Sequence, residues 1–109
     1  MFAERQLKIN RFGQNIAFSV RVFMPVQQDG AWGCRYEIDW PDRPRAGEMF
    51  GIDSMQALLH AMQAVGSELY ASDEHAQGIL RWTDEGGGYG FPVPRIVRDL
   101  LMGDDAKYL

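Results

Sequence analysis

The chain has 109 residues, enough to bury one hydrophobic core but too few for two, so we expect a single domain over residues 1–109. A formal net charge of −4 and a sequence pI near 5.0 argue against nucleic acid as a partner, because phosphate binding requires a basic patch. The single cysteine, Cys34, excludes an internal disulfide and a metal site built from several thiolates.

The sequence also indicates where the protein works. Residues 1–6 lack the basic stretch and the apolar core of a signal peptide. No window of the chain is long and apolar enough to span a bilayer, so we expect no membrane partner. We therefore expect a soluble, cytoplasmic protein.

Two strands open the chain. Leu7 and Ile9 alternate with polar residues, and a longer strand follows with apolar residues at the even positions from Ile16 to Met24. The apolar sides share one face only if the loop between the strands has an even number of residues. A two-residue turn at Gly13-Gln14 meets this condition, because glycine suits the first central position of a type II′ turn. This turn pairs Ile9 with Phe18 and Leu7 with Val20.

The third strand, residues 32–40, has an apolar residue at every even position and a charged residue or glycine at every odd one. A two-residue Asp29-Gly30 turn would set its polar face beside the apolar face of the second strand. We therefore expect a three-residue loop, Gln28-Asp29-Gly30, with Gly30 left-handed in a G1 bulge. Pro25 then lies opposite Gly33 and removes a donor from the ladder, which a local bulge would absorb. The expected pairs are Val26/Trp32, Met24/Cys34, Val22/Tyr36, Val20/Ile38 and Phe18/Trp40.

A loop, a short strand and the main helix come next. The composition of residues 41–47 predicts a loop, and residues 48–52 predict a fourth strand. Asp53 can cap a helix, and Gln56 three residues later completes a capping box. Apolar residues then recur at helical spacing, which predicts one buried stripe. The stripe consists of Met55, Leu58, Leu59, Met62, Val65, Gly66 and Leu69.

The remainder of the chain adds one strand and one short helix. Residues 79–82 predict a fifth strand, 84–90 a glycine-rich turn and 90–94 an extended segment. Residues 95–102 predict a helix that follows Pro94 and ends at Gly103. The whole pattern predicts an α+β fold. It comprises an antiparallel sheet of about five strands, one long helix packed on the aromatic face and a short C-terminal helix.

No motif in the sequence predicts catalysis, a cofactor or a metal. Glycines 86–88 lack the following Lys and hydroxyl residue of a phosphate-binding loop, so we expect a turn. His60, Glu74 and His75 lack the spacing of metal ligands and predict polar surface residues. Cys34 lies on the aromatic face of its strand and predicts a core residue. We expect a protein that is not an enzyme.

The outer face of the sheet is a candidate binding surface. The odd positions of the second and third strands place Arg21 opposite Glu37 on this face, and such charges are often only solvated cross-strand ion pairs. Arginine and aromatic residues are also typical anchors of protein interfaces. The glycine-rich turn ends in two aromatic residues that offer further contact area. The candidate partner-binding residues are Arg21, Phe23, Arg35, Glu37, Tyr89 and Phe91.

The helix start Gly51-Ile52-Asp53-Ser54-Met55-Gln56-Ala57-Leu58 resembles a small bacterial protein family that is classified only as a domain of unknown function. Leu69-Tyr70, Leu80-Arg81-Trp82 and Gly90-Phe91-Pro92 extend the resemblance over most of the chain. These motifs are a helix cap, core positions and a turn. The resemblance therefore implies neither an active site nor an activity.

Two classes of function follow from these observations. The first is a non-enzymatic module of the immunity or adaptor type that binds another protein, in keeping with the small size, the mild acidity and the outer sheet face. The second is a small-molecule-binding protein or an enzyme with a cleft between the helix and the loop at residues 86–91. Either one could also form a homodimer through an edge strand.

Overall fold

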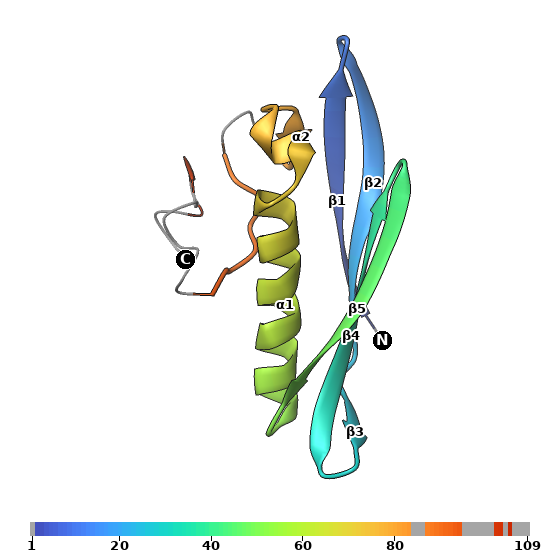
Figure 1. The fold of residues 1–109 in the computed structure, drawn as a ribbon, viewed down its shortest axis with the longest axis vertical. Coiled ribbons are helices and arrows are strands. Elements are labelled where there is room, and N and C mark those ends of the chain that lie inside the picture. Colours follow the sequence, from blue (N-terminus) through green and yellow to red (C-terminus); the bar gives the residue numbers. More distant parts are fainter. Residues whose placement is uncertain (1, 84–86, 95–101, 104, 106–109) are drawn as a thin grey trace.

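One antiparallel sheet and a layer of helices make up the fold (Figure 1). This computed structural model describes residues 2–83, 87–94, 102–103 and 105. The helices are α1 (Ser54–Tyr70) and α2 (Asp73–Ala76). The strands are β1 (Phe2–Arg11), β2 (Gln14–Phe23), β3 (Val26–Gln28), β4 (Ala31–Trp40), β5 (Arg43–Gly51) and β6 (Leu80–Arg81).

The strands lie across the sheet in the order β6, β1, β2, β4, β5, and β3 continues the line of β2 beside β4. The long helix α1 packs on one face, over β4 and β5. The aromatic residues of β4 lie on this inner face, where Tyr36 and Trp40 are buried. The expected α+β fold, with its antiparallel sheet and one long helix, is confirmed.

The hairpin of β1 and β2 turns one residue earlier than we expected. Phe12 and Gly13 form the two-residue turn and have φ angles of 52° and 77°, so both central residues have the positive φ that a type I′ turn requires. The pairs are therefore Leu7 with Phe18 and Ile9 with Ile16, and the predicted pairs were wrong by two residues. The shift is even, so each side chain still points to the predicted face.

Between β2 and β4 the predicted register is confirmed at Val20/Ile38 and Val22/Tyr36. The rings of Phe18 and Trp40 also stack, with centroids 4.9 Å apart. Nearer the turn the prediction was wrong. β3 and β4 are joined by a two-residue Asp29-Gly30 turn, with φ angles of 45° and 84°, and Val26 pairs with Gly33 instead of Trp32. The register changes by one at Met24-Pro25, because proline cannot donate to the ladder there.

β5 is longer than predicted. Residues 41–47 were expected to form a loop, but the strand already begins at Arg43 and pairs with β4 as far as Gly51. Pro44 lies opposite Asp39 in this ladder. Because β5 pairs with no other strand among the described residues, its outer side needs no donor at Pro44.

The N-terminus of α1 forms as predicted. Asp53 is the N-cap, and its Oδ1 accepts from the backbone N–H of Gln56 at 2.8 Å. The Gln56 side chain in turn accepts from the backbone N–H of Ile52 at 2.7 Å, one residue before the position expected in a capping box. These two bonds fix the direction in which the helix leaves β5.

The predicted stripe of α1 is buried only in the second half of the helix. Val65, Gly66 and Leu69 are buried as expected, whereas the first turns bury Ala57 and Ala61. The helix crosses β5 at Gly51, where an added Cβ would lie 2.5 Å from the backbone nitrogen of Ala57. This close crossing turns the alanines toward the sheet. It leaves Met55, Leu58 and Leu59 partly exposed, so the prediction that they are buried was wrong.

The last described segments complete one side of the core. β6 pairs with β1 at Lys8 and Ile9, within the predicted strand at residues 79–82. Residues 90–94 run without regular structure, and Pro92 and Val93 contact α1 at Gly66. The helix predicted over residues 95–102 lies outside the described residues, apart from Met102, which is not helical.

Candidate functional site

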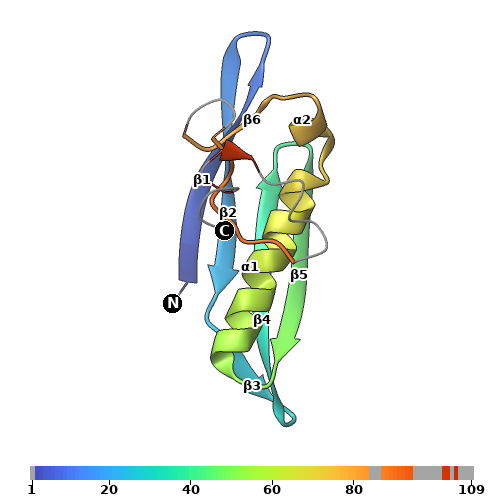
Figure 2. The ribbon, with the colours of Figure 1, turned by 90° about the vertical axis from the view of Figure 1, so that its left-hand side faces the viewer.

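An apolar groove opens on the inner face of the sheet. Figure 2 shows α1 lying over β4 and β5, while the segment at residues 87–93 crosses from β1 to α1. Between them the inner faces of β1 and β2 line a groove of about 210 Å³. Its lining is almost entirely apolar side-chain surface, with one acid and one arginine. The lining residues are Ala3, Glu4, Arg5, Val20, Val22, Leu58, Met62 and Phe91.

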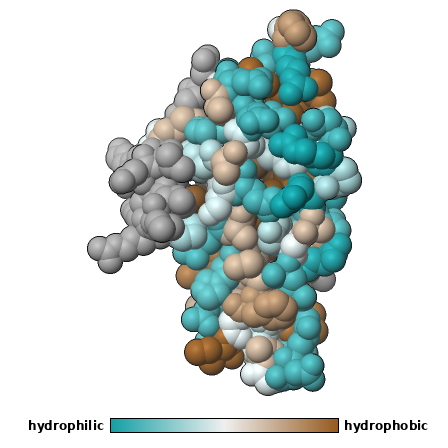
Figure 3. Space-filling model, viewed as in Figure 1, coloured by the Kyte–Doolittle hydropathy of each residue, from teal (hydrophilic) through white to brown (hydrophobic). Residues whose placement is uncertain are grey.

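The helix side of the groove belongs to an uncovered apolar flank. Positions three and four apart share one side of a helix, so Met55, Leu58, Leu59 and Met62 continue the flank that carries Gly66. Phe91 to Val93 cover this flank at Gly66 but not in the first turns. Met55 is 78% exposed. Figure 3 shows apolar surface at this end of the molecule, where β5 meets α1.

Arg5 and Asp105 together hold the backbone of Tyr89 and Gly90 at the end of the groove nearest Phe91. We call these hydrogen bonds the clamp. Nη1 of Arg5 donates to the carbonyl oxygens of these two residues at 3.1 and 3.0 Å. Oδ2 and Oδ1 of Asp105 accept from their backbone N–H groups at 2.8 and 2.9 Å. Tyr70 Oη also donates to Asp105 Oδ2 at 2.7 Å. The clamp fixes the position of Phe91, which closes the groove.

Arg5 is an unusual lining residue because it is partly buried among aromatic rings. Its guanidinium carbon lies 3.9 Å from the ring centroid of Trp82 and 4.9 Å from that of Phe91. Burial lowers its pKa below the usual arginine range, and the negative charge of Asp105 opposes this effect. Arg5 therefore binds the 89–90 segment and also brings a positive charge to the rim of the groove.

The glycine-rich segment thus binds a carboxylate, but this carboxylate is the Asp105 side chain of the same protein. Glycines 87 and 88 precede the two N–H groups that bind Asp105, and an added Cβ at Gly88 would lie 2.5 Å from the Asp105 carboxyl carbon. Gly86 and the two acidic residues before it lie outside the described residues. We expected only a turn here, because no sequence pattern links Gly90 to Asp105, which lies 15 residues further along the chain.

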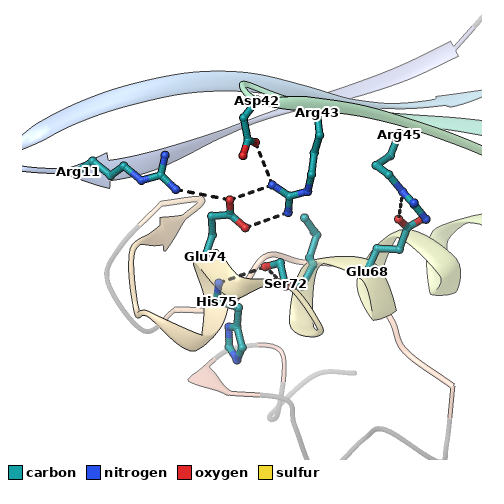
Figure 4. A network of polar contacts seen from close by, with 9 residues as sticks. Arg11, Asp42, Arg43, Arg45, Glu68, Ser72, Glu74 and His75 are labelled. Atoms are coloured by element: carbon teal, nitrogen blue, oxygen red, sulfur yellow. Dashed lines mark hydrogen bonds and ion pairs between the residues drawn. The ribbon is translucent and has the colours of Figure 1, made fainter.

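A second polar cluster lies at the other end of α1 (Figure 4). Glu74 is only 2% exposed, and both its carboxylate oxygens accept from Arg43 at 3.0 Å. Arg11 lies 3.7 Å away, and Arg43 also covers the ring of Trp40 at 4.5 Å. The hydrogen bonds from Arg43 lower the pKa of Glu74. The prediction that Glu74 is a surface residue was wrong, because arginines from β1 and β5 bury it.

His75 and Tyr89 form a pair beside this cluster. His75 Nδ1 lies 2.5 Å from Tyr89 Oη, and the rings of Tyr70, His75 and Tyr89 pack together. Burial lowers the pKa of His75 and raises that of Tyr89 to about 12. The neutral imidazole can therefore accept from the phenol. The pair joins α2 to the clamped segment.

The lowered pKa of His75 predicts a loss of stability in mild acid. The unfolded chain takes up this proton near the ordinary value of 6.5, whereas the folded chain does so only at lower pH. Stability should therefore fall as the pH drops from 6.5 to the folded pKa. Urea unfolding of the wild type and of His75→Gln on both sides of this window tests the expectation. An equal pH dependence for the two proteins would contradict it.

The outer face of the sheet carries four of the predicted site residues. Arg21 pairs with Glu37 across the strands, as predicted, and lies within 3.5 Å of Glu4 and Glu37 and 2.5 Å of Asp39. Arg35 lies 3.2 Å from Glu37, and its side chain is 56% exposed. Phe23 is half-buried. These charges largely satisfy one another.

Tyr89 and Phe91, the other two predicted residues, lie elsewhere and are buried. They are 2% and 5% exposed, so the prediction of an exposed aromatic turn was wrong. Gly88 and Gly90 have φ angles of 85° and 79°, which most other residues avoid. The segment bends at these two glycines, and both aromatic side chains enter the core.

The remaining candidates give no metal site. No group of three or more His, Cys, Asp or Glu side chains that could hold a metal occurs in the described ranges. His60 Nδ1 lies 2.7 Å from the carbonyl oxygen of Phe50. Cys34 is fully buried, as predicted, and its thiol donates to the carbonyl oxygen of Phe23 at 3.2 Å. Burial raises the pKa of this thiol, which disfavours the reactive thiolate.

Comparison with known proteins agrees with the resemblance seen in the sequence. Residues 3–93 match the model of a family described as a domain of unknown function, DUF6968. Neither a curated protein nor a solved structure gives a match. Among the described residues, no helix has the length and apolar character needed to cross a membrane.

Proposed function

The chain belongs to the DUF6968 family, whose function is unknown, and we propose from its structure that it is a module that binds another protein. The observation that supports this proposal is the apolar groove together with the uncovered flank of α1. Monomeric proteins rarely leave large contiguous apolar surface exposed, and such surface often marks an interaction site. We name the groove and the residues Met55, Leu58 and Leu59 together the apolar site.

The size of the groove favours a protein partner over a small molecule. Pockets for small molecules typically have volumes of about 300–1,000 Å³ and enclose most of the ligand. This groove has about 210 Å³, which suits one or two side chains of a partner. It does lie between α1 and Phe91, where the small-molecule alternative requires a cleft. Its apolar lining continues onto exposed helix surface, which suits a broader contact.

The outer sheet face is the weaker candidate for the contact. Arg21, the most central charge on it, already interacts with three carboxylates. A partner that used these carboxylates would have to replace existing ion pairs, and exposed pairs of this kind contribute little energy. Our proposal therefore moves the contact from Arg21 and Arg35 to the apolar site.

We propose a protein of the adaptor or immunity type that is not an enzyme and works in the cytoplasm. The polar clusters support only the non-enzymatic part of this proposal, because the carboxylates of Glu74 and Asp105 are bound by internal donors. A carboxylate that is bound in this way is poorly placed to act as a general base.

Replacing Leu58 by glutamate should abolish partner binding and leave the fold intact. Leu58 lines the groove and is 38% exposed, so a charge there can be solvated in the free protein but not in the complex. The measurement is the identity of the proteins that tagged wild type and variants retain from a lysate of the source organism. Unfolding curves of each variant show whether it is folded.

Two variants on the outer face serve as matched controls. Val26 is an exposed apolar residue on β3, so Val26→Glu introduces the same charge away from the groove. Arg35→Glu reverses a charge on that face. A protein that is lost with Leu58→Glu and kept with both controls supports the apolar site. Loss only with the controls would move the contact to the outer face, and retention of no specific protein by the wild type would refute the proposal.

A further inference from the structure

We propose that the partner binds as an extended segment that adds a strand to the open edge of β1, beside Glu4 and Gln6. This inference rests on the proposed function and specifies its geometry. β1 pairs with β2 along its whole length, from Phe2 to Arg11. On its other side, within the described residues, it pairs only with β6, at Lys8 and Ile9. Considering only the part of the chain that the structure describes, the first six residues of β1 therefore have one unpaired side.

The direction of the backbone groups on this side follows from one hydrogen bond. The N–H of Asn10 donates to the carbonyl oxygen of Ile79 at 2.9 Å, so Asn10 faces the β6 side of the strand. Backbone groups of alternate residues in a strand point to the same side. Gln6 and Glu4 therefore present their N–H and C=O groups to the open edge, which is the side of β1 that pairs with β6 further along the strand.

The apolar groove lies directly beside this edge. Ala3 and Arg5 of β1 line it, together with Leu58 and Met62 of α1. Alternate side chains of an added strand would point to this inner face. Because Ala3 is small, a large apolar side chain opposite it can extend over β1 into the groove. One added strand can therefore pair with the backbone of β1 and also place a side chain in the groove.

The other edge of the sheet, β5, is less suited to the addition of a strand. β5 carries Pro44 within its ladder, and proline is a common protection of an edge against pairing. On β1 the charged side chains near the open edge are already engaged. Glu4 accepts from Gln6 at 2.8 Å and from Ser19 at 3.1 Å, and Arg5 is held in the clamp.

The charges favour a partner segment over a second copy of this chain. Two copies paired antiparallel at this edge would place Arg5 opposite Arg5 in the register centred on Arg5 and Glu4 opposite Glu4 in the register centred on Glu4, and like charges opposite each other are destabilising. The register centred on Gln6 would place Glu4 opposite Lys8, where β6 already occupies the edge. A partner can avoid this with apolar residues at inward positions and uncharged polar residues on the outer face, where the Glu4 carboxylate already accepts from Gln6 and Ser19. The expected ligand is an extended peptide that alternates apolar and polar residues.

A library of random peptides displayed on phage, selected on the immobilised wild-type protein, tests this inference. The selected peptides should show the period of two in their apolar residues and should bind Leu58→Glu at least tenfold more weakly. Hydrogen exchange of the complex adds an internal control. The amides of Glu4 and Gln6 should exchange fast in the free protein and slowly with peptide, whereas Arg5 and Leu7, which face β2, should be protected in both.

One pair of variants separates backbone pairing from side-chain contact. Gln6→Pro removes the N–H that faces the open edge, and Gln6→Ala keeps it, so only the proline variant should lose peptide binding. Peptides with helical spacing, protection at other amides, or the absence of enriched peptides would overturn strand addition. Protection of Glu4 and Gln6 that rises with protein concentration alone would assign the edge to a second copy and also overturn it. A lysate partner that depends on Leu58 would still support the proposed function in each of these cases.

Discussion

Replacing Asp105 by alanine should lower the free energy of unfolding by about 3 kcal/mol. Asp105 is 2% exposed and accepts from two backbone N–H groups and from the Tyr70 hydroxyl. Alanine would leave these three donors, two of them buried and that of Gly90 partly buried, without the carboxylate, and each unsatisfied buried donor costs about 1–3 kcal/mol. Water that enters the released segment should recover part of this cost. Urea unfolding followed by tryptophan fluorescence measures the loss.

Two further variants define what the Asp105 result means. Asp105→Asn keeps the shape and one acceptor oxygen, so it should lose about half as much as alanine. Asp42→Ala removes a carboxylate whose side chain is 60% exposed, and it should change stability by less than about 0.5 kcal/mol. If Asp105→Ala unfolds at the wild-type urea concentration, the clamp does not stabilise the fold, and the position of Phe91 must depend on other contacts.

Alternation and parity predicted much of the sheet from the sequence. They placed the apolar side chains of β2 and β4 on one face and gave the correct Val20/Ile38 pair. The turn between β1 and β2 was harder to predict, because a register shift by two residues preserves every face and leaves no mark on the pattern. Pro25 was the useful signal. This proline lacks the N–H that the predicted ladder needs, and the structure changes register at the same point.

The apolar stripe of α1 shows why the candidate site could not be predicted directly. Helical spacing predicted that Met55, Leu58 and Leu59 pack against another part of the chain, and the sheet was the simplest candidate. The sheet instead packs against Ala57 and Ala61, because Gly51 allows close approach there. The helix α1 has more apolar residues than the sheet and residues 91–93 can bury, and this excess is visible in the sequence. Only the structure shows which of these residues stay exposed.

The polar clusters depend on contacts that sequence patterns do not encode. Arg43 and Glu74 are 31 residues apart, and Arg5 and Gly90 are 85 apart. Taken alone, Arg5, Arg43 and Glu74 are ordinary charged residues, and Gly90 is an ordinary glycine of a turn. Their pairing follows from the crossing of α1 over the sheet, which brings α2 beside β5 and the 89–90 segment beside β1.

Replacing Glu74 by glutamine should cost about 2 kcal/mol at neutral pH. The substitution keeps the volume of the side chain but removes the charge that accepts two hydrogen bonds from Arg43. Breaking a buried pair costs about 3–5 kcal/mol, and we expect less here because the Arg43 side chain is 39% exposed and can be solvated. Arg11→Gln, which removes only the contact at 3.7 Å, should cost less than about 0.5 kcal/mol.

The same substitution should flatten the dependence of stability on pH in acid. Arg43 holds the pKa of Glu74 below its ordinary value of 4.5, so just below that value the unfolded chain binds this proton and the folded chain does not. The contribution of the pair is complete above pH 4.5 and is lost as the pH falls through the folded pKa. Wild type and Glu74→Gln should therefore differ most at neutral pH and converge in acid. A difference that stays constant down to about pH 3 would show that Glu74 stabilises the fold through its packing and not through its charge.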